Sequence, residues 1–474
     1  MSSPQLTRRL GVFSLAMITA GSVDSIRNLP ATALFGSSLI FFFILGALFF
    51  LLPSALVSAE LASTSKEQGG VYSWVSQAFG KTSGFLAVWF QWIENVIWYP
   101  TILSFVAGTI GFLISPQLAN SKIFLISVIL TSFWTATLIN LMGIKSSAIF
   151  GNFCAIAGLL VPMTLIIALG ATWIFSGKPL QIQFTHESLL PHLGNSSMWV
   201  SLTGIMLSFC GMEIATVHAS DVKDPQRSYP RAMYITTIII LFTLMCGSLA
   251  IAMVLPQKQI SLVAGIMQAF AAFFTAYHLQ WILPIVAVML VIGGMGGVSN
   301  WIIAPTRGLL FALKEVRMAD VFCRRNKFGA PSVLLLAQAV IVTIITLVFL
   351  LLPSVNASYW LLTALTSQLY MLMYITLFLA AIRLRYKKID RAPGFMIPGK
   401  NWGMWFVAGA GLIGSLVTFI IGFIPPDNIN IGSIWHYETL LLVGLLSMSI
   451  LPYLGYLWAR EKEVLGTSQE VPSQ

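Results

Sequence analysis

Long apolar runs, separated by short polar segments, repeat along the whole chain. About 20 apolar residues are needed to cross a hydrocarbon core of about 30 Å, and twelve runs meet this requirement. The predicted spans cover residues 10–34, 36–62, 84–114, 122–141, 147–175, 198–220, 231–254, 281–312, 331–352, 357–381, 403–424 and 438–458. The pattern therefore predicts an all-α polytopic membrane protein.

The first predicted span is interrupted by a polar stretch, AGSVDSIRNLP, at residues 20–30. Residues 10–18 and 29–34 on either side are apolar, which is typical of two half-helices joined by an unwound break. Irregular backbone is tolerated at membrane depth only where it is buried in protein or lines a watery cavity. Asp24 lies in this break, and an ionisable group inside a membrane is costly and usually functional. The sequence thus predicts a cavity at the first span.

The sixth predicted span has a similar interruption, at residues 210–213, between apolar residues 199–209 and 214–217. Its acid, Glu213, lies 189 positions after Asp24. Repeats of five spans run in opposite directions through the membrane, because an odd number of crossings reverses the chain. Substrate is then held at mid-membrane, between the two breaks.

This spacing predicts one transporter domain over residues 1–474, with two repeats and two peripheral helices. The first repeat is expected at 10–175, the second at 198–381 and the peripheral helices at 403–458.

Composition and charge agree with a membrane location. Hydrophobic residues make up 57% of the chain, charged residues only 9%, and the mean hydropathy is +0.86, which excludes a soluble globular protein. With the N-terminus inside, the inner segments hold 22 of the 26 Lys and Arg residues. The asymmetry places residues 1–9 and 459–474 in the cytoplasm. The net charge of +10 therefore reflects topology, and no nucleic acid partner is expected.

The third span carries a second buried acid, Glu94, followed by Asn95. Glu94 lies ten residues beyond Gly84, about 15 Å along a helix and so close to the bilayer centre. Two interpretations are open. Glu94 binds a ligand or proton, or its carboxylate pairs with hydroxyl groups of a neighbouring helix.

The charge of Asp24 bears directly on what the first break can bind. The helix that resumes near Ser25 presents unpaired N–H groups and the positive end of its dipole, which favours anions. An ionised Asp24 would repel an anion about 4 Å away with an energy of about 4 kcal/mol, at an effective dielectric constant near 20. We therefore expect Asp24 to be protonated, to pair with Arg27, or to bind a cationic group of the substrate.

Other sequence features indicate less about the function. The basic residues after the tenth span are expected to set topology and to attract anionic membrane lipid; they are Arg383, Arg385, Lys387, Lys388 and Arg391. Neither nucleotide-binding nor metalloprotease motifs occur, and the histidines lack metal-ligand spacing. We expect no cofactor, no metal and no enzymatic activity, and a homodimer is left open.

Several motifs resemble signatures of the amino acid-polyamine-organocation transporter superfamily. They are Glu60-Leu61-Ala62 followed by Gly69-Gly70-Val71-Tyr72-Ser73-Trp74, Asp224-Pro225-Gln226-Arg227-Ser228-Tyr229-Pro230-Arg231-Ala232, and Ala304-Pro305-Thr306-Arg307-Gly308-Leu309. Two further groups are most similar to the bacterial glutamate/gamma-aminobutyrate antiporter branch, namely Ser25-Ile26-Arg27-Asn28-Leu29-Pro30 and Gly211-Met212-Glu213 with His218 five residues on.

The resemblance implies a leucine-transporter-like core in a bacterial plasma membrane, moving amino acids by alternating access. It implies that N–H groups of the first break bind the substrate carboxylate and that carbonyls of the sixth-span break bind its ammonium. The family's Gly-Ser-Gly falls on Val23-Asp24-Ser25, so Asp24 departs from the pattern. Family Trp and Asn positions fall on Trp301 and Asn95.

These considerations give a set of candidate residues. For substrate binding they are Gly21, Ser22, Val23, Asp24, Ser25, Glu94, Asn95, Phe209, Cys210, Gly211, Glu213 and Trp301; for proton coupling or gating they are Glu213, His218 and Arg27. Glu213 is expected to link transport to protons, because a substrate ammonium and a proton would compete for one carboxyl group. The alternatives are that His218 is the sensor, or that Glu213 only holds the broken helix.

The function that the resemblance implies is that of an amino acid antiporter. Three buried acids, Asp24, Glu94 and Glu213, outweigh one nearby base, Arg27, so neutral or cationic amino acids should be preferred. A proton-coupled symporter is the first alternative. A non-transporting nutrient sensor or channel is the second.

Overall fold

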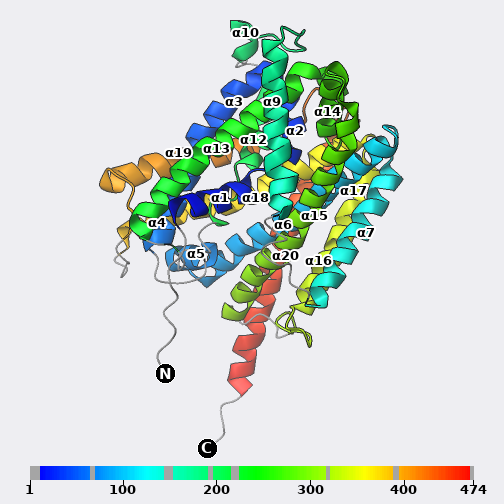
Figure 1. Cartoon of the computed structure of the whole chain (residues 1–474). Helices are drawn as coiled ribbons and strands as arrows, with labels where there is room; N and C mark the ends of the chain where they lie inside the picture. The colour runs from blue at the N-terminus through cyan, green and yellow to red at the C-terminus, as the bar shows by residue number, and fades with distance from the viewer. Residues whose placement is uncertain are drawn as a thin grey trace, which may run out of the picture.

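The computed structural model describes residues 11–64, 70–143, 153–190, 196–214, 222, 224–316, 321–387 and 394–469, and helices dominate it (Figure 1). In the first half these are α1 Val12–Val23, α2 Leu29–Ala33, α3 Leu39–Gly46, α4 Leu52–Thr64, α5 Val71–Phe79, α6 Lys81–Ile114, α7 Lys122–Leu141, α9 Val161–Phe175 and α10 His186–Leu189. In the second half they are α11 Ser196–Trp199, α12 Ser201–Ser208, α13 Pro225–Val254, α14 Gly265–Ala276, α15 Leu283–Glu315, α16 Ser332–Thr346, α17 Val348–Leu351, α18 Val355–Tyr386, α19 Lys400–Ile421 and α20 Ile434–Gln469.

Ten continuous helical segments of the described chain are long and apolar enough to cross a membrane. They correspond to ten of the twelve predicted spans. The two remaining spans, the first and the sixth, are the ones that the sequence predicts to be broken. The all-helical, polytopic fold is therefore confirmed, whereas the division into two inverted repeats stays a prediction.

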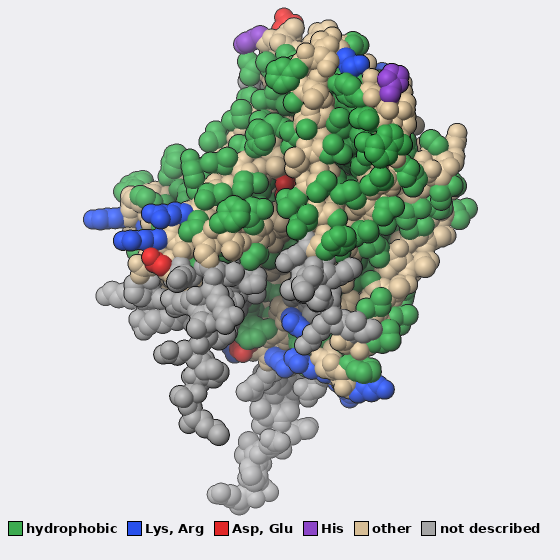
Figure 2. All heavy atoms as spheres, in the orientation of Figure 1, with side chains coloured by type: hydrophobic (Ala, Val, Ile, Leu, Met, Phe, Trp, Pro, Cys, Tyr) green, Lys and Arg blue, Asp and Glu red, His purple; other side chains and the backbone are tan. Residues whose placement is uncertain are grey.

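Burial separates central helices from peripheral ones. The most apolar window of Val355–Tyr386 is 78% buried inside the protein and that of Lys81–Ile114 is 72% buried, but the window of Ile434–Leu457 is only 22% buried. Helices α18 and α6 therefore form the centre, and α20 lies at the edge, projecting beyond the body at one end (Figure 1). Hydrophobic side chains cover the middle of the face in Figure 2, as a lipid-facing surface requires.

Several boundaries differ from the sequence prediction. Helix α13 begins at Pro225, six residues before the expected start, because proline is well accommodated at the first position of a helix. Helix α20 continues to Gln469, eleven residues beyond the predicted end of the twelfth span. Two short π-helical turns, Ala47–Leu51 and Ile156–Leu160, interrupt the second and fifth spans.

Candidate functional site

The break in the first span is short. Helix α1 ends at Val23, and Asp24 and Ser25 then adopt extended backbone angles. A 3-10 turn at Ile26–Asn28 leads into α2, where Pro30 fits the first turn because no N–H is needed there. The unwound part is therefore narrower than the predicted stretch 20–30, and Gly21 and Ser22 still belong to the helix.

The break in the sixth span follows α12. Residues 209–214 form turns, and Gly211 has φ +111°, a conformation that L side chains rarely adopt. The Gly211 N–H donates a hydrogen bond to the Tyr374 hydroxyl of α18 at 2.8 Å. A Cβ placed on Gly211 would lie 3.3 Å from Val23 Cγ2, so the two breaks pack against each other.

A cavity of about 190 Å³ lies where the breaks meet. It is smaller than the 300–1,000 Å³ typical of sites for drug-sized ligands, and so suits a smaller molecule. The first, third, fifth, sixth, eighth and tenth spans all contribute to its wall. The predicted site residues that line it are Gly21, Ser22, Val23, Asp24, Ser25, Arg27, Glu94, Asn95, Cys210, Gly211 and Trp301.

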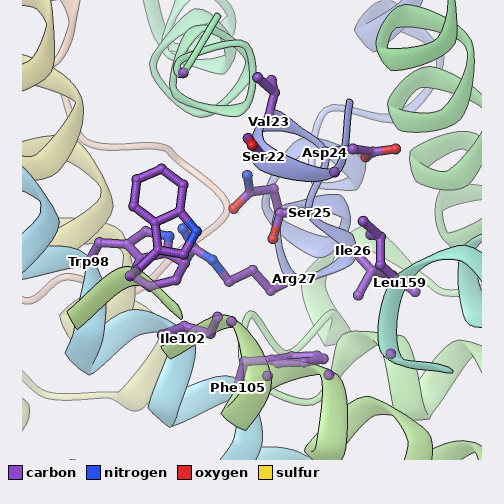
Figure 3. Close-up of a pocket in the computed structure, with 18 of the residues that line it drawn as sticks. Ser22, Val23, Asp24, Ser25, Ile26, Arg27, Trp98, Ile102, Phe105 and Leu159 are labelled. Atoms are coloured by element: carbon purple, nitrogen blue, oxygen red, sulfur yellow. The ribbon is translucent and has the colours of Figure 1, made fainter. Parts of the chain in front are cut away.

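Arg27 lines the cavity and is buried (4% exposed), and its side chain extends toward Trp98 (Figure 3). Its Nη1 donates to Thr101 Oγ1 at 2.8 Å and to the Tyr359 hydroxyl at 3.3 Å, and its guanidinium carbon lies 5.1 Å from the Trp98 ring centroid. Its Nε has no hydrogen-bond partner in the described part of the protein. Arg27 is thus fixed by neutral groups and keeps a donor available.

The third span supplies Glu94 and Asn95, which are both 4% exposed. Glu94 lies within electrostatic range of Arg27 and of Glu213, and no direct ion pair joins it to either within the described ranges. The Asn95 Oδ1 atom is buried without a hydrogen-bond partner among described residues. A positive group and a negative group therefore line one small cavity without neutralising each other by contact.

Asp24 points away from Arg27 and Trp98, as Figure 3 shows. Its Oδ2 accepts a hydrogen bond from Thr243 Oγ1 of α13 at 2.8 Å. The expected alternative in which Asp24 pairs with Arg27 is therefore wrong for this structure: the extended backbone at the break directs the two side chains to different helices.

Glu213 is buried (1% exposed) but does not line the cavity. Gln91 Nε2 and the Tyr370 hydroxyl donate to its Oε1 at 3.0 and 2.7 Å, and the Tyr374 hydroxyl donates to its Oε2. Tyr370, which does line the cavity, stands between Glu213 and the empty space. These bonds favour the alternative in which Glu213 holds the broken helix in place.

Two other expectations need comment. Phe209 does not line the cavity: it is the first residue after α12, and its ring packs on Phe43 at a centroid distance of 5.7 Å and lies beside Gly46. His218 lies outside the described residues. No cluster of three potential metal ligands occurs in the described ranges.

The basic residues after the tenth span make contacts within the protein that the sequence did not predict. Arg385 is buried and forms an ion pair with Glu60 at the end of α4. Arg383 lies over the Phe79 ring at 5.0 Å, and Lys387 Nζ donates to the Gln77 carbonyl near the end of α5 at 2.6 Å. These three residues join α18 to other elements, and attraction to anionic lipid stays a prediction. Lys388 and Arg391 lie outside the described ranges.

Sequence reasoning missed several residues of the site. Helical periodicity could have found Gln91 and Trp98, since with Glu94 and Asn95 they form one polar and aromatic stripe in an apolar helix. The others are Thr101, Thr243, Tyr359, Tyr370 and Tyr374, whose partners are far away in the sequence. No local pattern marks these pairs.

A mid-membrane cavity between two broken helices is the arrangement of a secondary transporter. Comparison with known proteins agrees: the amino acid permease family matches residues 10–446. An uncharacterized transporter of Legionella pneumophila is 44% identical over 447 residues, covering 94% of this chain and 96% of that protein. A glutamate/gamma-aminobutyrate antiporter of Lactococcus lactis is 29% identical over 454 residues, covering 95% and 90%.

A probable agmatine/putrescine antiporter of Lactococcus lactis is 24% identical over 400 residues, covering 84% of each chain. The chain belongs to the amino acid permease family, and the resemblance to the glutamate/gamma-aminobutyrate antiporter branch is confirmed. It is an amino acid transporter and a multi-pass membrane protein, not an enzyme.

Proposed function

We propose that this protein is an amino acid antiporter that works by alternating access and prefers neutral or cationic amino acids. The observation that carries the proposal is the cavity at the two breaks, whose lining includes one basic side chain, Arg27, together with Glu94 and Asn95. A zwitterion matches this lining. Its carboxylate would lie toward Arg27 and the amides of the first break, and its ammonium toward Glu94, Asn95 and the carbonyls of the sixth-span break.

The substrate preference follows from charge. Asp24 and Glu94 line the cavity together with one cation, Arg27, and Glu213 lies behind Tyr370. An anionic side chain would be repelled by whichever of these carboxyl groups is ionised, whereas a neutral or cationic side chain would not be. The relatives are named for glutamate and for agmatine and putrescine, which differ in charge, so their names do not decide the matter.

We propose further that both termini lie in the cytoplasm of a bacterial cell. The inward excess of Lys and Arg supports this orientation.

Transport into proteoliposomes tests the proposal. Purified protein is reconstituted with or without unlabelled amino acid inside, and uptake of labelled glutamine, ornithine or glutamate is measured. Uptake that requires internal amino acid supports antiport. Equal uptake into empty vesicles driven by a pH gradient would indicate symport, and no uptake of any amino acid would refute the proposal.

A further inference from the structure

Asp24 differs from the other charged groups of the cavity in how it is held. It is 92% buried, because its exposed fraction is 8%, and its Oδ1 has no hydrogen-bond partner among the residues that the structure describes. Its Oδ2 contacts Thr243 Oγ1, and the Ser25 N–H lies beside the carboxyl group. A carboxylate ion with an unpaired oxygen is costly in such a place, whereas a protonated carboxyl group is not.

The Thr243 hydroxyl has three acceptor oxygens within reach. Its Oγ1 lies 2.8 Å from Asp24 Oδ2, and 2.8 and 3.3 Å from the Ile239 and Ile240 carbonyls of its own helix. A hydroxyl has one proton to donate but two lone pairs that accept. If Asp24 is ionised, Thr243 donates to Asp24. If Asp24 is protonated, Asp24 donates to Thr243 and the hydroxyl turns to donate to Ile239, so the geometry fits both states.

Among the residues that the structure describes, no other charged side chain contacts the Asp24 carboxyl group. Arg27 is directed toward Thr101, Tyr359 and Trp98 instead. The other titratable side chains at the cavity, none of them bonded to Asp24 in the described structure, are Arg27, Glu94, Cys154, Cys210 and Tyr370. Cys246 follows Thr243 on α13 by three residues.

We propose that Asp24 and Thr243 form a proton-binding site, separate from the groups that bind the amino acid. The step is simple: the Asp24 carboxylate takes up one proton from water on one side of the membrane and releases it on the other. This inference deepens the proposed function and rests on it. It places the transported proton on Asp24 and leaves Glu213 to position the broken helix.

The test uses the full-length protein in proteoliposomes. Asp24→Asn keeps the shape of the carboxylic acid but cannot titrate. We expect wild-type exchange to change at least about tenfold between about pH 5.5 and pH 7.5, since one titrating proton gives up to tenfold per unit, and the variant to change less than about twofold. A pH-sensitive dye inside the vesicles should report proton movement for the wild type only.

Two control variants test whether this effect is specific to Asp24. Asp427→Asn makes the same change in the loop before α20, outside the cavity, and should match the wild type in rate and in pH dependence. Glu213→Gln should keep the pH dependence even where it slows exchange. Loss of pH dependence in Glu213→Gln, with retention in Asp24→Asn, would overturn the inference and move the proton to Glu213.

A second measurement applies if Asp24→Asn is inactive. Thr243→Val removes the hydroxyl partner, which should shift the midpoint of the pH profile by about 0.5–1 unit, and Thr243→Ser should restore it. An unchanged midpoint in Thr243→Val would overturn the inference, as would transport driven by a sodium gradient without proton movement. If wild-type protein moves no amino acid at all, the proposed function itself fails.

Discussion

Breaking the buried ion pair between Glu60 and Arg385 should destabilise the protein strongly. Both side chains are nearly inaccessible to solvent, Glu60 being 2% and Arg385 3% exposed, and each also has hydrogen-bond partners besides the other. The Ile397 N–H donates to Glu60 Oε2 at 2.7 Å, and Arg385 Nη2 donates to the carbonyls of Ile397 and Lys400 at 2.9 and 3.1 Å. Glu60→Gln would leave the Arg385 charge buried and uncompensated.

The expected cost of Glu60→Gln is about 3–5 kcal/mol, the usual range for removing one partner of a buried pair. The chain offers an exposed control: Lys81 and Glu315 lie 3.8 Å apart with side chains 65% and 45% exposed. Glu315→Gln should cost about 0–1 kcal/mol, because solvent screens such a pair. Glu60→Gln combined with Arg385→Met should lower the free energy of unfolding less than Glu60→Gln alone, because no buried charge is then left without a partner.

Thermal unfolding of the purified protein in detergent measures these differences. A loss of 1 kcal/mol lowers the melting temperature by about 2–4 °C in domains of 150–250 residues, and by about half as much in a chain of 474 residues, because the unfolding entropy grows with length. We therefore expect a drop of at least about 3 °C for Glu60→Gln and at most about 2 °C for Glu315→Gln. The reasoning fails if the two single variants melt at the same temperature, or if the double variant loses the sum of its single effects.

Three other outcomes are expected. Gly293→Ala should destabilise the protein by about 1–3 kcal/mol, because the new Cβ would lie 2.3 Å from Gly158 Cα. Gly297→Ala should melt near the wild-type temperature, because the nearest atom to its Cβ is Ile102 Cδ1 at 3.6 Å. Equal melting temperatures of the two variants would contradict this reasoning. Deleting residues 462–474 should leave exchange at neutral pH nearly unchanged, because this C-terminal segment is not basic enough to block the inner transport pathway. A protein that is inactive above pH 6 until it is truncated would refute this expectation. In competition assays at pH 7, glutamine and ornithine should inhibit exchange more than glutamate does, and the reverse order would reject the charge argument.

The sequence predicted the parts of the site that have a local signal. Polar residues inside an apolar span marked both breaks, because irregular backbone in lipid needs a cavity. Helix rise alone predicted a mid-membrane position for Glu94, and this residue lines the cavity. The resemblance to the family added Asn95 and Trp301, and both line the cavity.

Side-chain direction and distant partners had no such signal. Whether Phe209 faces the cavity or α3 depends on where α12 ends, and a shift of one residue rotates a helical side chain by about 100°. Asp24 and Arg27 are one turn apart in the sequence, yet Thr243 and Tyr359 decide where they point. The partners of Arg385 were missed for the same reason, since Glu60 lies 325 positions earlier.

One helix, α18, contacts charged residues of the N-terminal half near both of its ends, and this constrains biosynthesis. Arg27 is 332 positions from Tyr359, and Glu60 is 325 positions from Arg385. At about 5–20 residues per second, Arg27 is made roughly 15–65 s before the tyrosine that binds it. Until α18 enters the membrane, Glu60 lacks its ion-pair partner and Arg27 lacks the hydroxyl group of Tyr359. Chains terminated before residue 355 should therefore be preferred substrates of membrane quality-control proteases.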